Sequence, residues 1–205
     1  MPSIPALYPK AVYVGSPKYS ERGGYAPEAI VIHIAEGTVA GMDSWFNSPQ
    51  NTDASAHYGV NDITVHQYVD NNYGAWANGV IEPGHTAALI TENSGANPNR
   101  WTIAIEHEGK FPQQPSAATF ENSAQLAAWL FKNVLLVGGA TGVAVDRKHI
   151  LRHADISPKS RPNCPGWSEA VFSAYIARVK QIVEGGQIDP RIVQARDLLN
   201  QVLGN

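Results

Sequence analysis

The chain has 205 residues, of which 43% are hydrophobic, and this is enough to build one well-packed domain. Its net charge of −3 leaves no basic footprint, so we expect no nucleic-acid partner. No apolar run approaches the roughly 20 residues of a membrane span, and the first residues lack the apolar core of a signal peptide. We therefore expect a protein without membrane insertion or an export signal, and we expect it to be a monomer.

The first half of the chain predicts an arm, a buried strand, a short helix and a hairpin, in this order. Residues 1–28 are rich in Pro, Gly, Ser and Tyr, which predicts an irregular N-terminal arm packed on the domain. Residues 29–33 are a continuous apolar run, as expected of a strand buried on both faces, and this run ends in His33. A helix is expected at residues 38–46. Two alternating segments then predict a hairpin that turns at residues 61–62.

The second half begins with residues 70–100, a stretch rich in Gly, Asn and Pro that is too long for an ordinary connection and predicts a binding loop. Strands interleaved with helices indicate an α/β fold with a central mixed sheet flanked by helices. Residues 29–185 would form this domain, and residues 186–205 would be a C-terminal helical extension. The expected strands lie at residues 101–109 and 148–153, and the expected helices at residues 116–137, 167–184 and 190–203.

The single cysteine, Cys164, lies in the segment HADISPKSRPNCPG and cannot form a disulfide within the chain. It is therefore a buried apolar side chain, a nucleophile or a metal ligand. The Pro, Asn and Gly residues around it predict a rigid surface turn, which disfavours the buried side chain. His153 begins the same segment, and His33 ends an earlier strand. Three ligands of these types, with a fourth position left open, are typical of a catalytic zinc site.

The segments IVIHIAEGT, SAHYGV, WTIAIEHEG and HADISPKSRPNCPGW resemble, in this order, the motifs of zinc-dependent N-acetylmuramoyl-L-alanine amidases of the type-2 family. That family includes T7 lysozyme-like phage endolysins and shares its fold with peptidoglycan recognition proteins. The resemblance covers residues 29–180. It implies a central mixed sheet flanked by helices, Zn²⁺ held by His33, His153 and Cys164, and cleavage of the amide between N-acetylmuramic acid and L-alanine of bacterial peptidoglycan.

The resemblance also implies a catalytic glutamate. Glu106 follows an apolar strand, where a carboxylate is unfavourable unless it faces a cavity or a partner. Because the family has its catalytic glutamate at the matching position, Glu106 is the expected general base. A structural ion pair is the alternative role for Glu106, and Glu108 is the substitute candidate for the base.

A cation at the developing oxyanion is a further implication of the resemblance. The family often has a lysine two residues before the third zinc ligand, but this chain has Pro162 there. Lys159 matches the T7-like spacing from His153 and is the expected catalytic cation. Arg161 is nearer to Cys164 and is the alternative, with a substrate contact as its other expected role.

Three more substrate contacts follow from departures from the family pattern. T7-like members carry a tyrosine immediately before the histidine of the second motif, whereas this chain has Ala56 before His57 and Tyr58 after it. If Ala56 and Tyr58 share a strand face, Tyr58 reaches the site, and packing is the alternative. The segment GAWANG lacks a histidine that relatives often have there, which leaves Trp76 and Asn78 as expected contacts. His57 is either a hydrogen-bond partner of a zinc ligand or a paired strand histidine.

The function expected from these residues is a peptidoglycan hydrolase, specifically a phage or prophage endolysin that stays in the host cytoplasm until its release to the cell wall. One alternative is a non-catalytic muropeptide-binding module of the same fold, which the retention of Cys164 and both histidines disfavours. The other is a cytoplasmic amidase that recycles anhydro-muropeptides.

Overall fold

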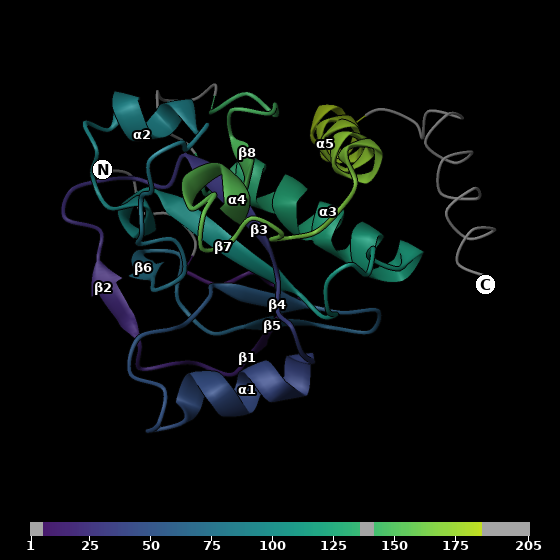
Figure 1. Cartoon of the computed structure of the whole chain (residues 1–205). Coiled ribbons are helices and arrows are strands. Elements are labelled where there is room, and N and C mark those ends of the chain that lie inside the picture. The colour runs from purple at the N-terminus through teal and green to yellow at the C-terminus, as the bar shows by residue number, and fades with distance from the viewer. Residues whose placement is uncertain (1–5, 136–141, 186–205) are drawn as a thin grey trace.

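The protein has a six-stranded main sheet with the strand order β1-β5-β4-β7-β3-β8 (Figure 1). The computed structural model describes residues 6–135 and 142–185. The inner strands β4, β7, β3 and β8 are parallel, whereas β5 runs antiparallel to β4. The sheet is therefore mixed, as the sequence predicts. Its strands are β1 (Val12–Tyr13), β3 (Ala29–Ile34), β4 (Tyr58–Val60), β5 (Val65–Gln67), β7 (Thr102–His107) and β8 (Ile150–Arg152).

Two segments that the sequence predicts as irregular contain short elements. In the N-terminal arm, β1 extends the main sheet beside β5, and β2 (Tyr19–Glu21) pairs antiparallel with β6 (Tyr73–Ala75) of the predicted binding loop. That loop also holds the helix α2 (Ala88–Glu92) and the 3₁₀ helix η1 (Pro98–Arg100). The sequence did not indicate these strands of the arm, because two or three residues are too few for hydrophobic periodicity to reveal a strand.

Helices cover both faces of the sheet, which confirms the expected fold class. The long helices α3 (Ala117–Asn133) and α5 (Glu169–Glu184) lie side by side on one face (Figure 1). The opposite face is covered by α1 (Val39–Asn47), α2 and the loops around them. The three longest helices begin where a side chain accepts a backbone N–H, which stabilises a helix start. These N-cap residues are Thr38, Ser116 and Ser168.

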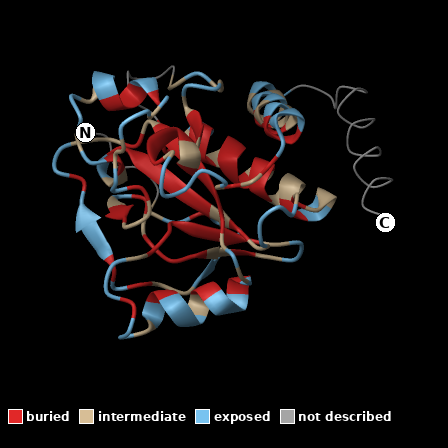
Figure 2. Ribbon diagram, in the orientation of Figure 1, coloured by how far each residue is buried: buried red, intermediate tan, exposed pale blue. Residues whose placement is uncertain are grey.

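Every residue of β3 is buried, as predicted for a strand covered on both faces (Figure 2). Ile30 and Ile32 face the core beneath α3 and α5, whereas Ala29 and Val31 belong to the core on the other face. Because side chains alternate along a strand, His33 lies on the same face as Val31. His33 is paired with Glu106 of β7, so the Glu106 side chain lies on that face too.

Gly59 of β4 is paired with Glu106 and lies close to the side chains of Met42 and Tyr68. A Cβ atom at this position would lie 2.8 Å from Met42 Cε and 2.9 Å from Tyr68 Oη. Both distances are shorter than atomic packing allows, so a side chain here would force the side chains of Met42 and Tyr68 to move. The glycine therefore lets α1 pack closely against the strands that carry the site.

The helix α5 ends at Glu184, and Gly185 follows it in the left-handed conformation with φ 69°. Such a glycine is a common helix stop because it has no Cβ to strain. The predicted helix at residues 190–203 and the predicted extension at residues 186–205 lie outside the described residues. Among the helices that the structure describes, none combines the length and the apolar character needed to cross a membrane.

Candidate metal centre

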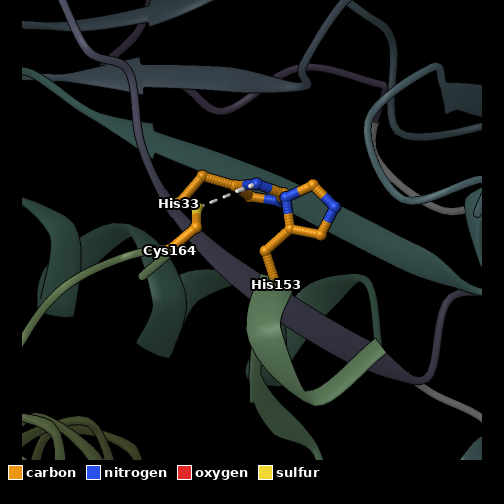
Figure 3. A group of neighbouring side chains, drawn as sticks. All are labelled: His33, His153 and Cys164. Carbon is orange, nitrogen blue, oxygen red and sulfur yellow. Dashed lines mark hydrogen bonds between the residues drawn. The ribbon is translucent and has the colours of Figure 1, made fainter. Parts of the chain in front are cut away.

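Three residues that are distant in the sequence meet at the C-terminal edge of the main sheet. His33 lies near the end of β3, His153 begins the short helix α4 (His153–Ile156) directly after β8, and Cys164 lies in the loop beyond α4. One donor atom from each residue lies within 4.8 Å of the other two, and Figure 3 shows the side chains pointing toward one another. This edge is where open α/β sheets usually form their sites.

The backbone of α4 and the following loop holds Cys164 against His153. The N–H of Ala154 donates to Cys164 O at 3.1 Å, and the N–H of Cys164 donates to Arg161 O at 3.2 Å. The N–H of Arg161 in turn donates to Ser157 O at 2.9 Å. These bonds fold the loop back over α4, so the turn predicted around Cys164 brings the thiol to the histidines.

Asp155 fixes the position of α4 itself. Its carboxylate accepts a hydrogen bond from the N–H of Arg152 at 2.6 Å and another from the hydroxyl of Thr86 at 3.2 Å. It also forms an ion pair with Arg147 at 2.8 Å. These contacts join β8, α4 and the segment before α2, and they hold His153 at the sheet edge.

The donor atoms of the three residues fit Zn²⁺. Cys164 Sγ lies 3.8 Å from His33 Nδ1, close to the separation of about 3.5 Å expected for sulfur and nitrogen ligands around tetrahedral zinc. Burial lowers the pKa of His33 well below its ordinary value and that of His153 to about 4, so both rings are neutral and offer lone pairs. Burial raises the pKa of Cys164 to about 12. Binding of a metal would convert this thiol to the thiolate and release its proton.

Glu106 lies beside this cluster, as the sequence predicts. Its Oε1 is 3.8 Å from His33 Nδ1, and its Oε2 is buried without a hydrogen-bond partner in the part of the chain that the structure describes. Burial raises the pKa of Glu106 to about 8, an effect that the charge of Arg161 opposes. Among the described residues, no Lys or Arg lies within ion-pair distance of Glu106. A buried carboxylate with one oxygen unused is poised to exchange a proton.

Glu108, the substitute candidate, lies elsewhere. Its Oε2 accepts the N–H of Val39 at 2.7 Å, at the first residue of α1, and an amide N–H of Asn61 at 3.3 Å. These bonds tie the start of α1 to the β4–β5 hairpin. Glu108 does not line the cavity at the cluster, so its contacts give it a structural role.

The two candidate cations differ in position. Arg161 lines the cavity at the cluster, and its charge acts on the pKa values of His33, His153, Glu106 and Cys164. Lys159 does not line this cavity. Its N–H donates to Glu82 Oε2 at 2.6 Å, and hydrogen bonds from this turn, together with the Lys159 charge, lower the pKa of Glu82. The structure thus brings Arg161, and not the expected Lys159, to the metal centre.

A cavity of about 710 Å³ opens at the cluster and is lined by all three candidate ligands and Glu106. Trp76 also lines it, as expected of a substrate contact, and its indole N–H donates to Ser20 Oγ at 2.7 Å. Two carboxylates that the sequence analysis missed, Glu36 and Asp53, line the same cavity. Glu36 directly follows the apolar segment IVIHIA, and its place after a buried strand could have marked it as a site residue. Asp53 lies in a polar loop, whose sequence carries no such signal.

Tyr58 does not reach the cavity. Its side chain is 0% exposed, packs in the core beneath α3 and α5, and donates a hydrogen bond to Asn71 Oδ1 at 2.9 Å. It is paired with Ile105, whose side chain faces the same core. Ala56 lies before β4 and packs on the opposite face, so the alternation assumed for Ala56 and Tyr58 does not apply. Packing, the alternative role, is what the structure shows for Tyr58.

His57 is a buried structural histidine. Its Nδ1 accepts the N–H of Ala104 at 3.0 Å, so its proton is on Nε2, which lies 3.0 Å from Tyr73 O. Burial is the larger cause that lowers the pKa of His57 to about 3, and the positive charge of Arg22 is the second cause. The ring therefore stays neutral. These contacts join β7 to β6 and leave no ring nitrogen for a zinc ligand.

Comparisons with known proteins agree with this fold. Residues 23–167 match the family described as N-acetylmuramoyl-L-alanine amidase. The chain is 32% identical to N-acetylmuramoyl-L-alanine amidase A of Achromobacter lyticus over 102 residues, which make up 48% of this chain and 48% of that protein. The chain therefore spans about half the length of this curated relative.

Solved structures share the fold at low sequence identity. A selenomethionine derivative of AmpD matches 82% of this chain and 96% of its own, with a TM-score of 0.61 and 22% identity. A mutant of PlyL matches 83% of this chain and 98% of its own, with a TM-score of 0.59 and 17% identity. Because the family match covers well over half of its residues, this chain belongs to the type-2 N-acetylmuramoyl-L-alanine amidase family.

Proposed function

We propose that the protein is a zinc-dependent hydrolase that cleaves the amide bond between N-acetylmuramic acid and L-alanine in peptidoglycan. The observation that carries this proposal is the cluster of His33, His153 and Cys164 at a cavity that Glu106 also lines. Glu106 Oε2 has no hydrogen-bond partner among the described residues. Two neutral imidazoles and one thiol are a typical ligand set for catalytic zinc. Membership of the amidase family supports the choice of substrate bond.

The zinc ligands and Glu106 have different roles in the proposed amide hydrolysis. A zinc ion held by the three ligands would supply Lewis-acid chemistry at the scissile carbonyl. Glu106 takes the proton of the attacking water and delivers it to the nitrogen of L-alanine as the C–N bond breaks. Its raised pKa makes it a stronger proton acceptor than an exposed glutamate. One carboxylate can serve both proton transfers because both occur on the same side of the carbonyl carbon.

We assign the role of the catalytic cation to Arg161. Its guanidinium lies on the wall of the cavity, where it can donate hydrogen bonds to the carbonyl oxygen as negative charge develops there. The position of Lys159, beside Glu82, argues against the lysine that the family spacing favours.

We further propose intact peptidoglycan as the substrate, in the endolysin role expected from the sequence, with the enzyme held in the host cytoplasm until its release. The rim of the cavity supports this choice, because Asp53, Val80 and Arg161 are all exposed. A stem peptide that is still attached to its glycan strand can therefore enter from the surface. Recycling of soluble anhydro-muropeptides is the competing role.

Mass spectrometry of digested peptidoglycan tests the proposed reaction. Incubation with purified sacculi should release free stem peptides that begin with L-alanine, and the glycan strands should keep their lactyl groups. A parallel digestion of soluble anhydro-muropeptides compares the two substrate sources. Rapid cleavage of the soluble substrate without release from sacculi would favour the recycling role, and cleavage at any other bond would overturn the proposed function.

We expect the purified protein to contain about one zinc ion per chain, because the three ligands form a single site. Cys164→Ser should lower both the zinc content and the activity, since a hydroxyl is a much poorer zinc ligand than a thiolate. Metal analysis by mass spectrometry measures the content. His66→Ala is the control, because His66 pairs with Asp43 away from the cluster and should leave the zinc in place. Full zinc content in Cys164→Ser would remove Cys164 from the ligand set.

Glu106→Gln should lower kcat by about 100-fold or more, because it removes the group that transfers protons. The variant should keep its fold and its zinc, since glutamine has nearly the same shape. Glu108→Gln is the matched control, and its kcat should stay within a few-fold of that of the unaltered protein. Steady-state hydrolysis of a muramyl peptide measures both variants, and equal rates for the two would argue against Glu106 as the base.

Arg161→Ala should lower kcat by about 100-fold with a smaller change in KM, as expected when a donor to the developing oxyanion is lost. Lys159→Ala should have little effect on either constant because its side chain lies outside the cavity. Kinetics of the two variants, with zinc content measured in each, decide between the residues. The opposite ranking would restore Lys159 as the catalytic cation.

A further inference from the structure

The two ring nitrogens of His33 face different surroundings. Nδ1 is directed toward Cys164 Sγ and Glu106 Oε1, each at 3.8 Å, and so toward the metal centre. Nε2, on the far side of the ring, is buried and has no hydrogen-bond partner of regular geometry within the described residues. The same is true of Asn78 Oδ1. Ala77 and Gly79, the neighbours of Asn78 in the chain, line the same cavity as His33. The Asn78 side chain interacts with His33 and raises its pKa, against the larger lowering by burial.

The orientation of the Asn78 amide follows from its other contact. Asn78 Nδ2 donates to Thr102 Oγ1 at 3.0 Å, and the hydroxyl of Thr102 donates to Pro98 O at 2.7 Å. Because the threonine hydroxyl donates its only proton to Pro98 O, it can only accept a hydrogen bond from Asn78. The NH₂ group of the amide is therefore fixed toward Thr102, which leaves the carbonyl oxygen Oδ1 for the imidazole.

The backbone of Asn78 is held just as firmly. Its N–H and that of Ala77 donate to Asn99 Oδ1 at 2.6 and 3.2 Å. The segment around Asn99 is fixed by Arg22 of the N-terminal arm, whose guanidinium donates to Arg100 O at 2.8 Å and to Thr102 O at 3.2 Å. The Arg22 side chain is only 5% exposed. Asn78 thus projects from a rigid support, and its own side chain is 1% exposed.

We propose that Asn78 is a positioning residue for the zinc ligand His33, and that its Oδ1 accepts the proton of Nε2. This bond would hold the ring in the tautomer whose Nδ1 lone pair points at the metal. Metal-bound histidines usually donate their second ring N–H to an acceptor of this kind, which fixes the ring and strengthens the metal–nitrogen bond. The assignment replaces the expected substrate contact, because Asn78 lies behind His33 and does not line the cavity. It rests on the proposed zinc site.

Zinc affinity tests this assignment directly. The dissociation constant of zinc is measured by competition with a chromophoric chelator for the unaltered protein, Asn78→Leu and Asn78→Asp. Leucine has a similar size but no acceptor, so Asn78→Leu should weaken zinc binding by about 10- to 100-fold. Aspartate keeps an acceptor oxygen for Nε2, so Asn78→Asp should bind zinc within a few-fold of the unaltered protein. If the leucine variant does not fold, Asn78→Ala takes its place.

Asn51→Leu controls for the loss of a buried asparagine. Asn51 is 2% exposed, and its side chain bonds backbone groups of Trp45 in α1 and of Asp53 and Ala54 in the loop that follows. This variant should lose thermal stability without losing zinc affinity. The visible spectrum of the cobalt-substituted protein gives a second readout, because a released His33 ring should shift the ligand-field bands in Asn78→Leu but not in Asn51→Leu.

Two results would overturn the positioning role of Asn78. One is an unchanged zinc affinity in Asn78→Leu, and the other is an equal loss in Asn78→Leu and Asn78→Asp. Neither result would contradict the proposed zinc site itself. Absence of zinc binding by the unaltered protein would instead overturn the proposed function, so the two failures are distinguishable.

Discussion

The parallel pairing of β3 with β7 is the constraint on which the site depends. In this register His33 lies opposite Glu106, so the first candidate ligand and the proposed base emerge from one face at the same height. The strand β8 pairs with the other side of β3 and delivers His153 directly after its last residue. A slip of one residue between β3 and β7 would turn one of these two side chains into the opposite core.

A chain of buried hydrogen bonds holds the backbone of His33. The backbone carbonyl of His33 accepts from His107 Nδ1 at 2.9 Å. His107 Nε2 then accepts from Ser123 Oγ at 2.7 Å, and Ser123 lies 2.8 Å from Tyr175 Oη, so this chain of bonds joins β3 to α3 and α5. Burial lowers the pKa of His107 to about 4, which keeps it neutral in this role. Satisfied buried networks of this kind rigidify the elements that they connect.

The electrostatics of the cluster favour a bound cation. Burial raises the pKa of both Glu106 and Cys164, because each charged form lacks solvation inside the protein. Arg161 is the charged side chain whose influence reaches both groups, but it lies exposed on the cavity wall. A divalent metal between His33, His153 and Cys164 would stabilise the thiolate and the carboxylate together. The cost of burying these acids is then offset only in the metal-bound protein.

The sequence by itself predicted the buried strand that ends near His33, because a continuous apolar run is a local signal. It also singled out His33, His153, Cys164 and Glu106, through their residue types and their place in motifs that resemble the amidase family. Only the tertiary structure decided where the side chains of Tyr58, Asn78 and Arg161 lie. Tyr58 faces the core because β4 takes its register from β7. Asn78 is held outside the cavity by its hydrogen bonds with Thr102 and Asn99. Arg161 lies at the cavity because the loop folds back over α4. The contacts of Tyr58 and Asn78 join segments far apart in the chain, and those of Arg161 lie in an irregular loop, so hydrophobic periodicity carries no information about them.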